Sequence, residues 1–517
     1  MCVSRIYCVD IHFQVKILII IAQEAPLHLV CENALYGASA SFLVCHNKVQ
    51  HHLSDDAKKH SMQFHVILRL KTRCPSRVMR DLTLNNDPSG QNAWKRYGKT
   101  GVLTKLRTKE EYIAAAETYL TPNYGKRDLV LVRGEKCKVW DIDGNEYLDF
   151  LSGISVNNLG HCPPAVVEAV QAQIQQFMHC SNFYIIPSQV ELAAQLCELS
   201  FARRCFFCNS GAEANEAAIK LARLYAKKKF SPEGYEIITM RNSFHGRTLA
   251  TISATGQEKV QKGFEPLVPG FRYATFNDIE SVRAAITEHT CAIMLEPVQG
   301  EGGIVPAQPE FLKAVKDLCV ERGFLLIFDE VQCGMGRCGR LFAHQLYGID
   351  PDIMTLAKAL GNGYPVAAML ATEEVGQHLT AGTHGSTFGG NPPACAAGVA
   401  VLREMVTKNI PAYAEQMGNK FVGMLRELLS SLPNVKEIRS KGLMVGIELT
   451  HEGAQVVKEC LKRGLIINCT MGNVLRLLPP LIVTEDECKH AATIISEVLQ
   501  LESVTGTGSS SNTAANA

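Results

Sequence analysis

The chain has 517 residues, of which 46% are hydrophobic and 20% are charged. This composition is typical of a globular protein and excludes a disordered or fibrous chain, and the length is sufficient for more than one hydrophobic core. A formal net charge of +1 argues against general nucleic-acid binding. No window reaches the roughly 18 apolar residues of a membrane-spanning helix, so we expect neither a nucleic-acid nor a membrane partner.

The charge is unevenly distributed along the chain. Residues 1–108 contain 15 Lys and Arg against 7 Asp and Glu, whereas residues 109–517 contain 37 against 44. The first part therefore carries +8 and the second −7. A basic segment poor in acidic residues is typical of an organellar targeting sequence. Because the N-terminus is not clearly amphipathic, an unstructured extension or a mis-assigned start remains the alternative.

The 19 cysteines do not predict a disulfide framework, since their number is odd and their spacing irregular. We interpret most of them as reduced, small apolar side chains. Cys205 and Cys208 have C-x-x-C spacing, but no second pair or histidine cluster follows to complete a zinc site. The sequence therefore predicts packing roles for these two residues and no metal site.

The predicted elements begin near Thr108, which forms a capping box with Glu111 at a helix start. A β-hairpin is predicted over 138–150, with its turn at Asp143-Gly144. Helical and strand patterns then alternate from about residue 163 to 370. Continuous apolar runs at 291–295 and 324–328 indicate strands buried on both faces. This alternation predicts a three-layer α/β domain around a mostly parallel sheet.

The last part of the chain predicts a smaller α+β domain. Its elements are a helix over 392–406, strands over 435–439 and 443–449, and a helix over 484–501. A tail rich in Gly, Ser, Thr, Asn and Ala follows. The predicted organisation is a basic extension at 1–108, small-domain segments at 109–163 and 396–503, a large domain at 164–395, and a disordered tail at 504–517.

Two motifs are typical of anion binding. The turn containing Gly211 and Ala212 joins an apolar strand to a helix, so backbone N–H groups at the helix N-terminus would favour a phosphate. A plain glycine turn would look similar. The segment 382–392 combines hydroxyl groups and glycines beside another helix start. It indicates a second anion site, with a flexible loop as the alternative.

Two further motifs carry ionisable side chains. Asp329 follows an apolar strand, at the edge where open α/β sheets bind ligands, and its carboxylate could pair with a protonated ring nitrogen. Lys358 lies among small and apolar residues, and poor solvation would lower its pKa and favour Schiff-base chemistry. An ordinary strand-end acid and a surface lysine are the alternatives. Together the four motifs fit pyridoxal 5′-phosphate (PLP).

Six motifs occur in an order that resembles one family. They are S-G-A-E-A-N-E, S-F-H-G-R-T, E-P-V-Q-G-E-G-G, F-D-E-V-Q, A-K-A-L-G and H-G-S-T-F-G-G-N-P. Over roughly residues 110–503 the chain resembles the class III aminotransferases of the fold-type I PLP superfamily. The resemblance implies a large α/β domain, a smaller α+β domain built from the N- and C-terminal parts of the core, and a homodimer with shared active sites.

The resemblance also implies a role for each cofactor-binding residue. Lys358 would carry the cofactor and shuttle the substrate proton, while Asp329 would keep the pyridine nitrogen protonated. Gly211 and Ala212 would bind the cofactor phosphate through their backbone N–H groups, and Thr387 of the neighbouring subunit would complete that phosphate site. Phe244 would stack on the cofactor ring, and Gln332 would form a hydrogen bond with its phenolic oxygen.

Five substrate-binding residues follow from the same resemblance. Arg247 would bind the distal α-carboxylate of the amino donor, and Arg476 the α-carboxylate of 2-oxoglutarate or glutamate, because a guanidinium pairs with a carboxylate through two hydrogen bonds. Glu301 would pair with Arg476 while the donor is bound. Ser386 completes the predicted set together with Ile154. Ornithine-specific relatives carry Tyr at the position of Ile154, so an apolar residue there favours a donor with an acylated amine.

The implied reaction transfers the δ-amino group of N2-acetyl-L-ornithine to 2-oxoglutarate, giving N-acetyl-L-glutamate 5-semialdehyde and L-glutamate in arginine biosynthesis. The alternatives are ornithine δ-transamination and transamination of succinylornithine, succinyldiaminopimelate or 4-aminobutyrate. A non-catalytic PLP-binding regulator is a more distant one. Because arginine biosynthesis of this type is often organellar in eukaryotes, we expect a mitochondrial-matrix location, with plastid or cytoplasm as alternatives.

Overall fold

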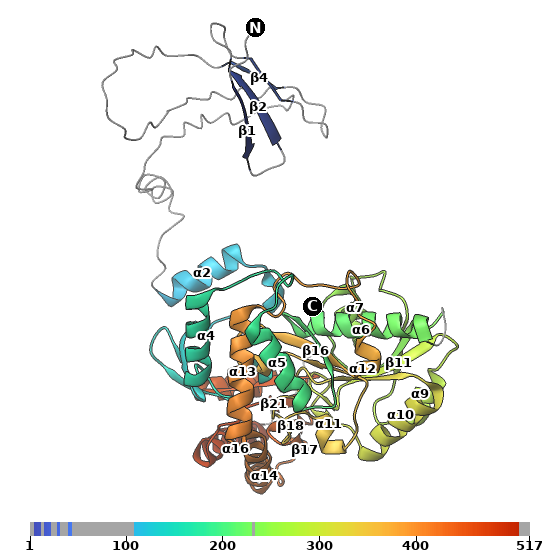
Figure 1. The fold of residues 1–517 in the computed structure, drawn as a ribbon. Helices are drawn as coiled ribbons and strands as arrows, with labels where there is room; N and C mark the ends of the chain where they lie inside the picture. The colour runs from blue at the N-terminus through green and yellow to red at the C-terminus, as the bar shows by residue number, and fades with distance from the viewer. Residues whose placement is uncertain are drawn as a thin grey trace. The chain divides into compact units, whose positions relative to one another are not determined.

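The computed structural model describes residues 108–229 and 233–505, with side chains to 502, and the backbone of four short segments before residue 44. The chain forms two compact units, 1–104 and 105–517 (Figure 1). In the first unit two antiparallel pairs are present, β1 (Arg5–Ile11) with β2 (Val15–Ile21) and β3 (His28–Cys31) with β4 (Ala40–Leu43). The predicted nature of the segment 1–108 stays a prediction. The rest of 1–107, and the predicted tail from residue 506, lie outside the described residues.

A seven-stranded sheet forms the centre of the second unit. Its order is β10 (Phe271–Ala274), β9 (Glu236–Met240), β11 (Thr290–Leu295), β14 (Leu325–Asp329), β15 (Ile353–Leu356), β16 (Ala367–Ala371) and β8 (Arg204–Cys208). The first five strands run parallel, and β16 is antiparallel to both of its neighbours. The prediction of a mostly parallel sheet is confirmed.

Helices cover both faces of this sheet (Figure 1). Along β14, Leu325 and Ile327 pack in the cluster that contains the apolar side of α6 (Gly211–Lys229). Leu326 and Phe328 pack in the opposite cluster, which contains α10 (Pro309–Arg322). Because successive side chains of a strand point to opposite faces, the uninterrupted apolar run is explained by burial on both sides.

Two four-stranded sheets lie beside the central one in the chain's second unit. One has the order β17 (Val435–Lys441), β18 (Met444–Leu449), β21 (Val474–Leu477) and β20 (Asn468–Thr470). The other has β19 (Leu465–Ile466), β7 (Glu146–Asp149), β6 (Lys138–Asp141) and β5 (Leu131–Glu135). Because β19 pairs with β7, the N- and C-terminal parts share a sheet, and the predicted β6–β7 hairpin is present. The predicted boundaries at 163 and 395 stay predictions.

The remaining elements connect and cover these sheets. They are α2 (Lys109–Tyr119), η1 (Pro122–Tyr124), α3 (Ser152–Ser155), α4 (Pro164–Gln176), α5 (Pro187–Glu198), α7 (Leu249–Ala254), α8 (Glu258–Gln261), α9 (Ile279–Ala284), β12 (Val298–Gln299), β13 (Val305–Pro306), α11 (His344–Tyr347), η2 (Lys358–Leu360), α12 (Glu373–Gly376), α13 (Pro392–Thr407), α14 (Ile410–Leu429), α15 (Ala454–Lys462) and α16 (Glu485–Thr505). The capping box of Thr108 and Glu111 begins α2. At the other end, α16 includes the first two residues of the predicted tail, 504 and 505. Within the described part of the chain, no helix has both the length and the apolar character needed to cross a membrane.

Candidate active site

A cavity of about 400 Å³ opens at the carboxyl edge of the central sheet. Asp329 ends β14, Lys358 follows β15, and Gly211 begins α6 after β8, so the connections that follow three strands of the sheet meet there. Seven of the predicted site residues line the cavity: Gly211, Ala212, Phe244, Arg247, Asp329, Gln332 and Lys358. Segments up to 147 residues apart in the sequence thus form one site.

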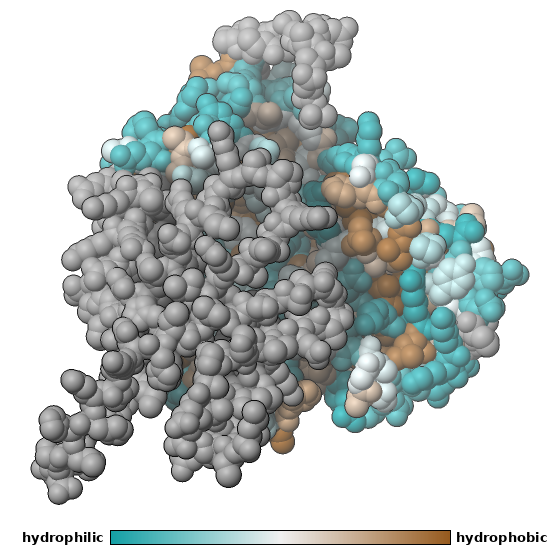
Figure 2. Space-filling view, turned by 90° about the horizontal axis from the view of Figure 1, so that it is seen from above, coloured by the Kyte–Doolittle hydropathy of each residue, from teal (hydrophilic) through white to brown (hydrophobic). Residues whose placement is uncertain are grey.

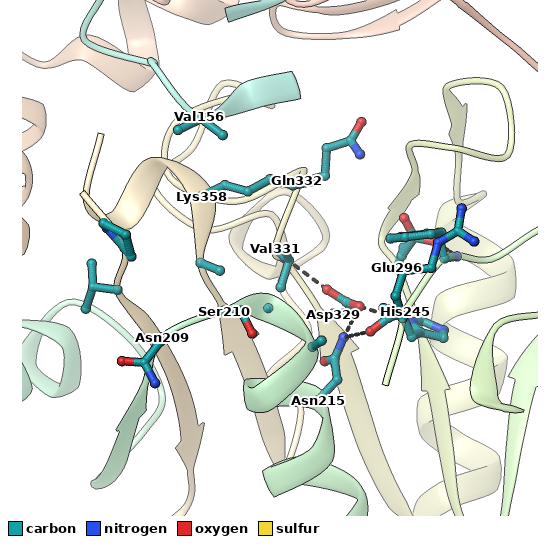
Figure 3. Close-up of a pocket in the computed structure, with 18 of the residues that line it drawn as sticks. Val156, Asn209, Ser210, Asn215, His245, Glu296, Asp329, Val331, Gln332 and Lys358 are labelled. Carbon is teal, nitrogen blue, oxygen red and sulfur yellow. Dashed lines mark hydrogen bonds and ion pairs between the residues drawn. The ribbon is translucent and has the colours of Figure 1, made fainter. Parts of the chain in front are cut away.

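The carboxylate of Asp329 is held in a fixed orientation (Figure 3). Its Oδ2 atom accepts a hydrogen bond from Asn215 Nδ2 at 2.7 Å and lies 2.8 Å from His245 Nδ1, while its Oδ1 atom accepts from the Val331 N–H at 3.0 Å. Thr355 Oγ1 in turn donates to Asn215 Oδ1 at 2.7 Å. Of these five residues, all but Val331 are buried. Protein contacts alone therefore orient the Asp329 carboxylate.

The start of α6 forms the predicted cradle. Glu213 accepts the N–H groups of Asn209 and Ser210 at 2.6 and 3.0 Å. Gly211 and Ala212 line the cavity, and their N–H groups lie in the first turn of the helix, where a helix provides no partner for them. A Cβ atom at Gly211 would lie 2.7 Å from Val331 Cγ1. Glycine is therefore required for close packing here, and the first-turn N–H groups suit an anion.

Lys358 enters the cavity from the first residue of η2. Its backbone φ is 46°, in the left-handed region, which is strained for a side-chain-bearing residue and is found mainly at functional sites. Burial lowers the pKa of the Lys358 ammonium below its usual value, while the Glu301 carboxylate opposes that shift. A larger fraction of neutral amine is therefore available than at an exposed lysine.

Phe244 and Arg247 form another side of the cavity. The Phe244 N–H donates to Glu296 Oε1 at 3.0 Å, and the Gly300 N–H donates to Glu296 Oε2 at 3.1 Å. Burial raises the pKa of the Glu296 carboxyl to about 7. Arg247 is exposed, with its guanidinium carbon 5.5 Å from the centre of the Phe244 ring. Its positive charge is thus available to a ligand above the ring.

Arg476 and Glu301 lie behind the cavity lining. Arg476 is buried on β21, and its Nη1 donates to Glu301 Oε1 and, at 3.2 Å, to Gln332 Oε1. Burial opposes ionisation of Glu301, but the Arg476 guanidinium outweighs it and lowers the pKa of that carboxyl. The structure therefore contains the predicted ion pair, with Gln332 joining it to the cavity.

Besides Arg476 and Glu301, three predicted residues do not line this cavity. Ser386 and Thr387 line a separate cavity of about 530 Å³, and Thr387 is exposed. Ile154 packs against the cluster that contains Val298 and Ile304, because the left-handed turn at 152–155 directs it away from the cavity. Val156, two residues later, lines the cavity instead. Ile154 is not among the residues that line this cavity, and its role toward the substrate stays a prediction.

Sequence reasoning did not find four residues of the site: Asn215, His245, Glu296 and Val156. Asn215 lies four residues after Gly211, one helical turn along the same face of α6, and His245 follows Phe244 directly. These two spacings could have placed Asn215 and His245 at the site from the sequence. No local pattern places Glu296 or Val156 at the cavity. Within the described residues no group of three or more metal-binding side chains is present.

The chain matches the sequence model of the aminotransferase class-III family over residues 119–499. It is 51% identical to the acetylornithine aminotransferase of Methanocaldococcus jannaschii over 394 residues, which are 76% of this chain and 98% of that protein. A structure of the ornithine aminotransferase of Toxoplasma gondii with PLP at partial occupancy superposes with a TM-score of 0.75 at 34% identity, covering 79% and 99% of the two chains. The acetylornithine aminotransferase of Elizabethkingia anophelis superposes with a TM-score of 0.69 at 32% identity, covering 77% and 100%. The chain therefore belongs to the class-III aminotransferases.

Proposed function

We propose that this enzyme binds PLP and transfers the δ-amino group of N2-acetyl-L-ornithine to 2-oxoglutarate. One observation carries the proposal: Lys358, the fixed carboxylate of Asp329 and the N-terminus of α6 surround a single cavity. These groups match an aldehyde, a ring nitrogen and a phosphate. The relative from Methanocaldococcus jannaschii, at 51% identity over 98% of its length, supports the choice of donor.

PLP, when bound, supplies an electron sink that makes the C–H bond beside the transferred nitrogen acidic. The residues of this chain bind and orient it. Lys358 Nζ would hold its aldehyde carbon and move the proton at the amine-bearing carbon of the substrate. The Asp329 carboxylate would hold the proton on the ring nitrogen, because its own orientation is fixed by Asn215 and His245. The first-turn N–H groups of α6 would bind the phosphate.

Two guanidinium groups would orient the substrates. Arg247 is exposed at the cavity and suits the α-carboxylate of the donor. Arg476 is paired with Glu301, so it is neutralised when a donor without a second nearby carboxylate is bound. For glutamate or 2-oxoglutarate, Glu301 would release Arg476 to the substrate carboxylate. A single site can then accept two substrates of different charge.

An acylated donor is favoured over free ornithine because the wall at Val156 is apolar. It offers no acceptor to a free α-ammonium, and an unpaired buried charge is costly. The test compares kcat/KM for N-acetylornithine with kcat/KM for ornithine. We expect at least a tenfold preference for the acetylated donor, and equal or better use of ornithine contradicts the proposal. Loss of the visible absorption of bound PLP on adding glutamate separates an enzyme from a passive binder.

We also propose a homodimer in which Thr387 serves the neighbouring active site. Among the coloured residues in Figure 2, apolar side chains gather in patches between hydrophilic ones. Phe183, Ile185 and Phe388 are 92%, 86% and 61% exposed. Asn182 Nδ2 donates to the carbonyls of Ser386 and Gly389 at 3.0 Å, so these side chains belong to one surface beside Thr387. Large exposed apolar patches mark interfaces.

Mixing two inactive variants tests the dimer. Lys358→Ala and Thr387→Asp each damage both sites of a homodimer. In a mixed dimer one site receives both defects and the other receives neither, so activity recovers to about a quarter of the wild-type value after random mixing. No recovery, with subunit exchange shown by two affinity tags, contradicts the shared site.

The basic segment 1–108, with 15 Lys and Arg against 7 Asp and Glu, supports a mitochondrial location in a eukaryotic cell. Fusion of residues 1–108 to a fluorescent protein should direct it to mitochondria. A matched fusion lacking these residues should remain diffuse. Plastid or cytoplasmic fluorescence of the first fusion contradicts the proposed location.

A further inference from the structure

The backbone of α3 turns in the unusual, left-handed sense. Ser152, Gly153, Ile154 and Ser155 have φ angles of 46°, 66°, 63° and 62°. Only Gly153 adopts this conformation without steric cost. Each of the other three carries a Cβ atom that is crowded in this conformation. Such a run persists only where surrounding contacts impose it, and strain of this kind concentrates at functional sites.

Arg337 provides those contacts. Its side chain is fully buried, and within residues 108–229 and 233–502 it has no ion pair with a carboxylate. Its Nε donates to Ser155 Oγ at 3.0 Å, and its Nη2 donates to Asn158 Oδ1 at 2.6 Å and more weakly to Ser152 Oγ at 3.4 Å. One guanidinium therefore holds three side chains of the segment 152–158.

The other side of the guanidinium reaches the C-terminal part of the chain. Arg337 Nη1 donates to the carbonyl oxygens of Leu443 and Pro479 at 2.9 and 2.6 Å. Burial lowers the pKa of Arg337 to about 9, as expected where dipoles alone balance a charge. A buried charge of this kind is retained at a cost, which indicates a role that an apolar residue could not fill.

The held segment leads directly into the active site. Ser155 Oγ donates to the backbone carbonyl of Gln332 at 3.0 Å, and the Val156 N–H donates to the Ser152 carbonyl at 2.9 Å. Val156 lines the cavity, and Figure 3 shows it above Lys358 in that view. The position of this wall relative to Lys358 thus depends on the left-handed turn.

We propose that Arg337 is a positioning residue for the amino donor: it clamps the strained turn 152–155 and thereby fixes the apolar wall at Val156. The inference rests on the proposed function, since it assigns that wall to the acylated donor. Glutamate binds through Arg476, which is held by Asn468, Glu301 and Gln332 rather than by Arg337. Loss of the clamp should therefore affect the two amino donors unequally.

Arg337→Lys is the first test variant. A lysine Nζ is a single point and can retain the Leu443 and Pro479 carbonyls, but it lacks the planar fork that reaches Ser155 and Asn158. We expect KM for N-acetylornithine to rise at least tenfold, with KM for glutamate changed less than twofold. Arg340→Lys is the matched control, because Arg340 lies three residues away in an exposed ion pair with Glu415 and should leave both values unchanged.

Ser155→Ala is the second test variant, and it removes one hydrogen bond of Arg337 together with the hydrogen bond from Ser155 to the Gln332 carbonyl. It should shift the same donor ratio in the same direction, by at least threefold. Its effect should add only in part to that of Arg337→Lys, since the Arg337–Ser155 hydrogen bond is lost in both variants. If Arg337→Lys does not fold, the effect of Ser155→Ala on the two donors tests the proposal by itself. Equal loss for both donors, or no loss for either, overturns the proposal and leaves Arg337 a purely structural residue.

The wild-type enzyme separates failure of this inference from failure of the proposed function. If wild-type enzyme uses glutamate but not N-acetylornithine, the proposed donor is wrong, and the comparison is repeated with whichever terminal-amine donor it accepts. The clamp is then judged by the same unequal effect on that donor and glutamate.

Discussion

The Nδ1 atom of His245 lies 2.8 Å from Oδ2 of Asp329, although the two residues are 84 positions apart. The His245 side chain is fully buried, and its Nε2 atom has no hydrogen-bond partner among the described residues. The ring therefore contributes its one contact to Asp329. This arrangement assigns His245 to orienting the carboxylate rather than to contacting a substrate.

Replacing His245 by Ala should reduce kcat/KM by about 10- to 150-fold, which corresponds to the roughly 1.5–3 kcal/mol of a hydrogen bond to a charged group. Asn215 and Val331 still hold Asp329, so PLP should remain bound, as measured by its absorption. His451→Ala serves as a control at a partly exposed histidine near Glu502. An unchanged kcat/KM for His245→Ala contradicts the orienting role.

Lys358→Ala should abolish turnover, because no other lysine lines the cavity in the described residues. Loss of a general acid–base group alone costs about 10²–10⁴-fold, and loss of the covalent anchor adds to it. Steady-state transamination of N-acetylornithine is the measurement. Lys313→Ala, at an exposed i,i+4 pair on α10, should be fully active. Substantial activity of Lys358→Ala contradicts the catalytic role assigned to Lys358.

Arg247→Ala should raise KM for N-acetylornithine by about 10- to 150-fold, the value of one charge-assisted contact, with little change in thermal stability because Arg247 is exposed. Arg272→Ala removes another exposed arginine, one paired with Glu236, and should leave KM unchanged. If both variants behave alike, Arg247 does not bind the donor carboxylate.

Glu301→Gln should leave Arg476 charged and without its carboxylate partner. We expect KM for glutamate and 2-oxoglutarate to fall and KM for N-acetylornithine to rise, because an unpaired buried guanidinium disfavours a donor without a second carboxylate. Kinetics of the two half-reactions, followed separately by absorption, measure this. Parallel changes in both half-reactions contradict the alternation of Arg476 between Glu301 and substrate.

Stability should fall as the pH rises from about 5 to 8. Burial raises the pKa of the Glu330 carboxyl to about 8, so in this window the folded state keeps a proton that the unfolded state has released, and a higher pH favours unfolding. Above pH 8 the Glu330 carboxyl is ionised in both the folded and the unfolded state, so the loss of stability is complete. Urea midpoints from pH 5 to 9 should show the decline, and Glu330→Gln should weaken it. An unchanged slope in the variant contradicts the assignment to Glu330.

The sequence by itself determined the α/β architecture and most of the cofactor site. Apolar runs at 291–295 and 324–328 predict strands buried on both faces, and the structure has β11 and β14 there. Gly211, Asp329 and Lys358 each follow or begin such an element, so their meeting at one sheet edge follows from the topology of parallel strands. These features are local, and periodicity and turn chemistry encode them.

Only the tertiary structure decided which side chains support and enclose that site. Glu296 binds two backbone N–H groups from different loops, and Arg337 joins the segment 152–158 to carbonyls more than 100 residues later. Because of the left-handed turn at 152–155, the residue that lines the cavity is Val156 rather than the predicted Ile154. Such contacts have large sequence separation and no local period, because packing and long-range hydrogen bonding select them after the sheet has formed.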